Sequence, residues 1–208
     1  MLDSFSENNK VTLTGRIEED PVFSHDFYGE NFYTFKLITD RLSETSDRIP
    51  VILSEKFLYT NDLSAGNTVE VTGQFRSYNN YTDIGNRLIL SVFARNITPV
   101  ASAEEAENPN AIQLTGYICK APVYRTTPFG REITDLLIAV NRAYNKSDYI
   151  PCIAWGLNAK YASVLSIGEK LRLTGRIQSR EYKKKYDDET VETKTAYEVS
   201  ISRLESIS

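Results

Sequence analysis

The chain has 208 residues, of which 41% are hydrophobic and 25% charged, and its formal net charge is −4. This length accommodates one large domain or two of about 100 residues, and no run of about 18 apolar residues could cross a bilayer. MLDSFSENNK (1–10) lacks the positive region and apolar run of a secretion signal, which predicts a cytoplasmic protein. With one histidine and two cysteines, no metal or other cofactor is expected.

The first hundred residues contain segments whose apolar and polar residues alternate with the period of a β-strand. They are VTLTGRI (11–17), NFYTFKLIT (31–39), RIPVILS (48–54), NTVEVTGQF (67–75) and RLILSVFA (87–94). Between the third and the fourth, EKFLYTNDLSAG (55–66) has a weak helical pattern and predicts a loop or a single helical turn.

The next segment, VASAEEAENPN (100–110), has few large apolar residues and separates two similar sequences. LTG at 13–15 recurs at 114–116, and SDRIP at 46–50 recurs as SDYIP at 147–151. The spacing is 101 residues and becomes 102 from Gly66 onward. We therefore expect a domain over residues 1–100, a linker over 101–110 and a second domain over 111–208.

The second copy repeats the strand order and has a clearer helix, LNAKYASVLSIG (157–168), in which Leu157, Tyr161, Val164 and Leu165 could form one apolar stripe. Five strands with a helix between strands 3 and 4 are typical of an OB-fold. The predicted fold class is all-β, with two tandem OB-fold domains built as five-stranded Greek-key barrels. Cys119 and Cys152 fall in the strand patterns and are predicted to be small buried hydrophobes.

The repeated SDRIP/SDYIP strand changes its side chains on one face. Residues at alternate positions share a face of a strand, so Arg48 and Ser54 lie opposite the core residues of the first copy. In the second copy Tyr149 and Trp155 occupy these positions. The two rings predict a platform on which bases stack. Packing under the loop after the first strand, or a subunit interface, is the alternative.

The hairpin SREYKKKYDDET (179–190) interleaves aromatic and basic residues, whereas its counterpart in the first copy has no basic residue before Arg87. A surface that follows a nucleic-acid strand needs rings and positive charge along one ribbon. A self-neutralising hairpin tip is the alternative. The second domain carries a net charge of +4 and residues 1–110 carry −8. The second domain is therefore basic although the chain as a whole is acidic.

The second copy resembles the bacterial single-stranded DNA-binding protein family. The resemblance rests on Gly116, Pro122, the RTTPFG turn (125–130), the aromatic-glycine pair at 155–156, and Gly168 with GRIQSREY (175–182). It implies base stacking by Tyr149, Trp155 and Tyr182, and strand contact by Arg142 and Tyr144. The first copy resembles the family mainly through the second. The candidate phosphate contacts are Arg125, Arg131, Arg142, Lys160, Arg176, Arg180, Lys183, Lys184 and Lys185.

The function predicted from these features is sequence-independent binding of single-stranded DNA in replication, repair or recombination, at the nucleoid, mainly by the second domain. No enzymatic activity is expected, because the chain has neither a P-loop nor a paired catalytic cysteine and histidine. The usual acidic recruiting tail of the family is missing from YEVSISRLESIS (197–208). Four OB domains per assembly would make the chain a homodimer. A protein–protein adaptor, a replication-restart accessory and an RNA binder are the alternatives.

Overall fold

The computed structural model describes residues 8–41, 43, 45–82, 85–103, 106–185 and 191–207. The elements of the first half are β1 (Asn9–Ile17), β2 (Val22–Phe27), β3 (Glu30–Asp40), β4 (Ser46–Ser54), α1 (Lys56–Thr60), β5 (Thr68–Thr82) and β6 (Gly85–Pro99). Those of the second half are β7 (Asn110–Ile118), β8 (Val123–Thr126), β9 (Glu132–Arg142), β10 (Lys146–Trp155), α2 (Gly156–Ser163), β11 (Lys170–Lys185) and β12 (Val191–Ser206). No helix in these ranges is long and apolar enough to cross a membrane.

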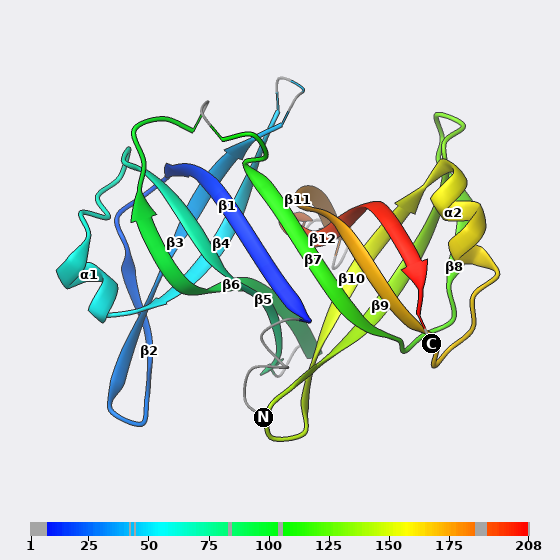
Figure 1. The fold of residues 1–208 in the computed structure, drawn as a ribbon, viewed down its shortest axis with the longest axis horizontal. Helices are drawn as coiled ribbons and strands as arrows, with labels where there is room; N and C mark the ends of the chain where they lie inside the picture. The colour runs from blue at the N-terminus through cyan, green and yellow to red at the C-terminus, as the bar shows by residue number, and fades with distance from the viewer. Residues whose placement is uncertain are drawn as a thin grey trace.

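Each half closes into a small barrel of the OB type. In the first half β1 pairs with both β3 and β5, and in the second β7 pairs with both β9 and β11. One parallel pairing completes each barrel, β4 with β6 and β10 with β12. The predicted fold class, two tandem OB-folds, is confirmed. Figure 1 shows the barrels side by side, with α1 and α2 at opposite outer ends.

The predicted strand count was one short in each half. β2 and β8 form hairpins with β3 and β9 at the two edges of the sheet, and every residue of β2 and β8 is exposed. Because neither face of these strands is buried, their sequences have no alternation of apolar and polar residues by which they could be recognised. Each helix therefore follows the fourth of six strands.

The predicted stripe on helix α2 was wrong. The helix ends at Ser163, its buried residues are Ala159 and Ala162, and Leu157 and Val164 are 85% and 77% exposed. Small side chains allow the helix to lie close to the barrel, where the Thr134 hydroxyl donates a hydrogen bond of 2.8 Å to the carbonyl of Ala159. The larger apolar residues are left facing solvent. In the first half the weak segment forms the single short turn α1, as predicted.

The glycines of the LTG motifs lie inside strands. A Cβ atom on Gly15 in β1 would lie 2.2 Å from the carbonyl oxygen of Ile38 in β3. A Cβ atom on Gly175 in β11 would lie 2.1 Å from the carbonyl oxygen of Ser200 in β12. Glycine is required at these positions because the backbones approach too closely for any side chain.

The two halves share one continuous sheet. Its strand order is β2-β3-β4-β6-β5-β1-β7-β11-β12-β10-β9-β8, with the antiparallel pair β1 and β7 at the centre. Val11 lies opposite Ile112, its equivalent in the repeat, so the pairing is centred on a pseudo-two-fold axis. Figure 1 shows β1 and β7 crossing the middle of the molecule.

Reciprocal hydrogen bonds reinforce this seam, by which we mean the contact between the two halves. The Asp47 carboxylate in β4 accepts a 2.7 Å bond from the backbone N–H of Ser179 in β11. Symmetrically, the Asp148 carboxylate in β10 accepts a 2.7 Å bond from the N–H of Ser77 in β5. Both carboxylates are fully buried. The repeated Asp and Ser residues thus hold the halves together.

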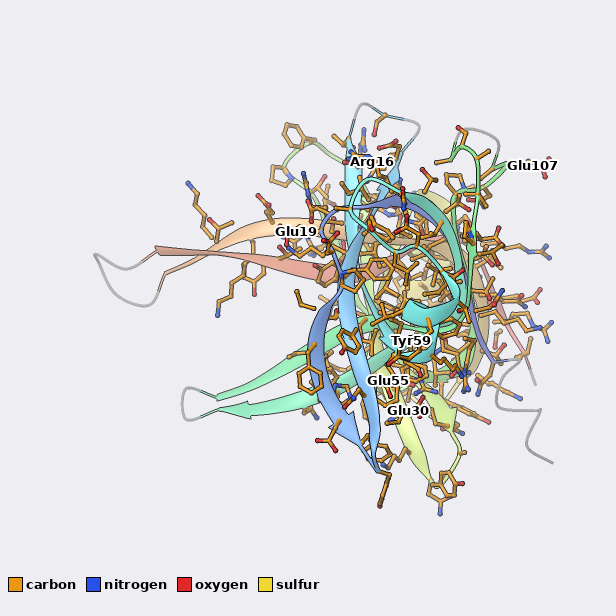
Figure 2. All side chains as sticks on the ribbon, turned by 90° about the vertical axis from the view of Figure 1, so that its left-hand side faces the viewer. Arg16, Glu19, Glu30, Glu55, Tyr59 and Glu107 are labelled. Atoms are coloured by element: carbon orange, nitrogen blue, oxygen red, sulfur yellow. The ribbon has the colours of Figure 1, made fainter. Side chains whose placement is uncertain are left out.

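The long hairpins β5–β6 and β11–β12 leave the barrels on the same side. Figure 2 shows them projecting together to the left of the view. Their bases belong to the barrels, where Phe75 and Ile177 are fully buried. The hairpins therefore extend a surface of each half into solvent.

Candidate nucleic-acid interface

Strand β10 presents its two aromatic residues on the side away from the core. Ile150, Cys152 and Ala154 are buried in the barrel, whereas Tyr149 is 43% exposed and Trp155 is half-buried. The predicted assignment of the two faces is therefore confirmed. Ile153, between the two rings on the outward side, is itself buried. Rings thus reach solvent near both ends of the strand.

Trp155 is held in place by the neighbouring strand. Its indole Nε1–H donates a hydrogen bond of 3.1 Å to the hydroxyl of Ser200 in β12. Because the polar edge of the indole is satisfied within the protein, the orientation of the ring is fixed before any ligand binds. A ring fixed in this way loses little conformational entropy when a base stacks on it.

The first half also has an aromatic ring at the pair of positions that Trp155 and Ser200 occupy in the second half, but the ring is on the other strand of the pair. Ser54 of β4 stands where the second half has Trp155, and Phe93 of β6 stands where the second half has Ser200. The equivalence follows from the pairings, since Ile52 lies opposite Phe93 and Ile153 lies opposite Ser200. Sequence comparison missed Phe93, because the hairpins differ in length and shift the repeat spacing beyond them. Strand pairing was the signal that was needed.

Tyr149 and Arg142 lie at the seam. The backbone N–H of Tyr149 donates a 2.7 Å hydrogen bond to the hydroxyl of Ser77 in the first half. Arg142 is half-buried and pairs with the buried carboxylate of Asp148, with its Nε 3.4 Å from Oδ2. Burial raises the pKa of Asp148, and the Ser77 N–H and Arg142 oppose this shift. Arg142 is therefore already committed to a carboxylate within the protein.

Tyr144 stands at the tip of the hairpin between β9 and β10. Its side chain is 89% exposed, and its backbone has a left-handed φ of 61°, followed by 53° at Asn145. A positive φ at an aromatic residue is uncommon and is maintained only where the surrounding turn requires it. The turn thus holds this ring out in solvent, within the loop that the family resemblance assigned to strand contact.

The other predicted cations differ in how far they are committed within the protein. Arg125 pairs with Asp135 at 2.6 Å, and Lys160 pairs with Glu132 at 3.1 Å. Within the described part of the chain, no ion pair involves Arg131, Arg176, Arg180 or Lys183. Arg131 lies at the β8–β9 turn, and the other three lie along β11.

The basic hairpin begins on β11. Arg180 and Lys183 are exposed, and Tyr182 is 38% exposed on the same side of β11 as Arg176 and Arg180. The side chains of Lys184 and Lys185 lie outside the described residues, as does the segment 186–190. Arg176, Arg180 and Tyr182 thus form a ribbon along β11.

No group of three or more metal-binding side chains occurs among the residues that the structure describes. His25 stacks on the ring of Phe32, with 5.1 Å between centroids, and its Nδ1 lies 2.9 Å from the hydroxyl of Ser24. The two cysteines are free, and burial raises the pKa of both thiols, more strongly at Cys152. A raised pKa keeps a thiol protonated and unreactive.

Residues 109–207 match the model of the Single-strand binding protein family. The second half of the chain is thus similar to that family. The single-stranded DNA-binding protein of Clostridium tetani is 35% identical over 83 residues, which cover 36% of this chain and 57% of that protein. The chain spans about half the length of the curated relatives that it matches.

Solved structures extend the likeness to the whole chain. The wild-type single-stranded DNA binding protein from Thermus aquaticus superposes with a TM-score of 0.75 over 96% of this chain and 93% of that one, at 22% identity. At this identity the likeness concerns the fold. The N-terminal domain of PriB protein from Thermoanaerobacter tencongensis, a dimeric structure, is 42% identical, with a TM-score of 0.40 over 46% of this chain and 99% of that one.

Proposed function

We propose that the protein binds single-stranded DNA without sequence preference, and that its second half makes the larger contribution. The observation that carries this proposal is the outward face of β10, where Tyr149 and Trp155 present rings on a barrel of the single-strand binding family. Stacking on aromatic rings tolerates any base, because every base has a π-face. The protein would act in the cytoplasm wherever replication, repair or recombination exposes single strands.

Positive charge supports the stacking. Arg176, Arg180 and Lys183 follow β11 without internal ion pairs among the described residues, so they have no carboxylate partner to give up when a phosphate binds. Each phosphate contact releases counterions, and affinity should therefore fall as salt rises. Arg125, Arg142 and Lys160 would have to exchange a carboxylate for a phosphate and should contribute less.

The direct test is a fluorescence titration, because Trp155 is the only tryptophan in the chain. Oligothymidine should quench its emission to saturation, and log affinity should fall with log salt by about 0.7 per phosphate contact. An oligouridine of equal length distinguishes DNA from RNA. Absence of any change in emission or anisotropy on adding a labelled strand at low salt would refute the proposal.

A second candidate function is a protein–protein adaptor, favoured by the apolar surface around α2. Leu157, Val164 and Ile167 are 85%, 77% and 62% exposed. An adaptor interface of this kind would depend little on ionic strength, in contrast to strand binding. The salt titration therefore separates the two functions.

A further inference from the structure

The outward face of the first half carries a ring flanked by two arginines. The Arg76 guanidinium lies 4.1 Å from the centroid of the half-buried Phe93 ring, and that of Arg95 lies 5.7 Å from it. Phe32 lies beside the ring, with 5.8 Å between centroids and the ring planes tilted by 41°, and is 7% exposed. The ring thus packs beside Phe32, and the guanidinium of Arg76 lies over it.

Positive charge is concentrated at this position beyond what the protein itself neutralises. Within the described residues neither Arg76 nor Arg95 forms an ion pair, and both donate to the side-chain oxygen of Gln74, at 2.9 and 3.4 Å. The buried Nε of Arg76 has no hydrogen-bond partner. Burial, followed by repulsion from Arg95 and Arg142, lowers the pKa of Arg76 to about 10. The guanidinium remains charged at neutral pH and would be stabilised by an anion.

This cluster borders the aromatic face of the other half. Arg76 immediately precedes Ser77, whose hydroxyl accepts the hydrogen bond from the N–H of Tyr149 across the seam. Arg76 is also close enough to Asp148 and Arg142 for each to influence its pKa. Arg76 and Tyr149 therefore lie close to each other across the seam.

We propose that Phe93, Arg76 and Arg95 form a second strand-binding subsite, in which a base stacks on the pair formed by the Phe93 ring and the Arg76 guanidinium, and the flanking phosphates contact the arginines. Guanidinium planes also stack on unpaired bases, so the flanking arginines can contribute in both ways. The subsite lies on the half whose net charge is −8. This net charge does not prevent binding, because a phosphate responds to the local field of the arginines and not to the net charge of the half. This proposal rests on the proposed function and extends the bound strand across the seam.

The test compares variants of the full chain on strands of two lengths. An OB-fold covers about 4–16 nucleotides, so about 8 nucleotides of oligothymidine fit one half and about 35 can reach both. Phe93→Leu, which retains an apolar side chain, should weaken binding of the longer strand about fivefold or more and change the shorter one less than about twofold. Arg95→Gln should reduce the salt slope on the longer strand by about 0.7.

The matched control is Lys56→Gln, which removes one exposed charge of the same half, on helix α1, where the ammonium lies over the ring of Phe57 and not that of Phe93. It should leave both affinities unchanged. If the parent binds both strands and Phe93→Leu and Arg95→Gln bind like the control, the subsite is refuted while the proposed function stands. If the parent binds neither strand, the proposed function itself fails.

A measurement on the unmodified protein removes any dependence on variant folding. Photo-crosslinking uses a DNA oligonucleotide in which halogenated deoxyuridine replaces thymidine, and mass spectrometry of peptides locates the crosslinks. They should occur at Phe93 in addition to aromatic residues of the second half. Crosslinks confined to residues 111–208 would overturn the proposal.

Discussion

At the scale of single residues, the two halves place an aromatic ring at the same site by different choices. In the second half Trp155 on β10 lies beside Ser200, and in the first Phe93 on β6 lies beside Ser54. In each half the equivalent position on the neighbouring strand is a serine. Replacing only the aromatic residue of a pair by serine should therefore leave that half without a ring at this position.

The first prediction uses this exchange. Trp155→Ser should weaken oligothymidine binding about fivefold or more, since a stacked base is worth roughly 1–3 kcal/mol. Adding Ser200→Phe recreates the arrangement of the first half and should restore part of the loss. Anisotropy with a labelled strand measures both affinities, and circular dichroism verifies the fold. Equal binding by Trp155→Ser and the parent would mean that this ring serves only packing.

The second prediction concerns pH and Asp148. Because burial raises its pKa above the ordinary value, ionisation of this carboxyl costs folding free energy near neutral pH, and the cost disappears as pH falls through the raised pKa. Asp148→Asn keeps the acceptor for the Ser77 N–H but does not titrate. As pH falls from about 7 to about 4, the parent should gain stability relative to the variant in paired denaturant melts. A change in the opposite direction would show that Arg142 and Arg76 dominate over burial.

At the scale of elements, alternation predicted the faces of the long strands correctly. Ile49, Val51 and Leu53 are fully buried as expected, because one side of β4 faces the barrel. Alternation failed for β2, which has no buried side. The apolar stripe at helical spacing failed for α2, because small alanines face the barrel. Contacts between strands were inaccessible to sequence comparison for a similar reason: the partner of Phe93 is defined by pairing across the sheet.

The third prediction follows from the pairing of β1 with β7. Residues 109–207 expressed alone would leave β7 as an open edge, and open edges pair with other strands. Since Val11 lies opposite its own equivalent, Ile112, two copies of β7 can pair in the same register, with Ile112 opposite Ile112. Size-exclusion chromatography with light scattering should show a dimer that retains strand binding.

Ser179→Ala in this fragment provides the control for the prediction. It keeps the backbone N–H that bonds to Asp47 in the full chain and removes the hydroxyl that lies 3.3 Å from the N–H of Arg48. In a dimer of fragments Asp148 of the second copy takes the place of Asp47 and can accept the same backbone bond, so the fragment should stay dimeric. A monomeric parent fragment would show that β7 requires the specific sequence of β1.

At the scale of the whole molecule, the exposed residues of α2 and β8 give a surface for assembly. Val123 on β8 is 51% exposed and Tyr161 on α2 is 42% exposed, near Leu157 and Val164. Apolar residues gathered at one end of a molecule are typical of a subunit interface. Two chains joined there would bring together four OB barrels.

The fourth prediction is therefore a homodimer. Light scattering of the full chain should give twice the mass of one chain, and Leu157→Glu with Val164→Glu should shift it to the monomer without loss of secondary structure. The matched control is Tyr59→Glu on α1, which is 81% exposed at the opposite end and should leave the dimer intact. A parent that is monomeric at working concentration would contradict the prediction.

The seam between the halves also bears on direction. A nucleic-acid strand has a 5′ and a 3′ end, and a symmetric dimer offers the same side chains to a strand running either way. Here the pseudo-two-fold axis relates unlike faces, with Tyr149 and Trp155 on one side and Phe93 on the other. The two orientations of a bound strand are thus inequivalent. Because the two copies form one chain with unlike faces, a strand bound as we propose would meet a different half at each of its ends.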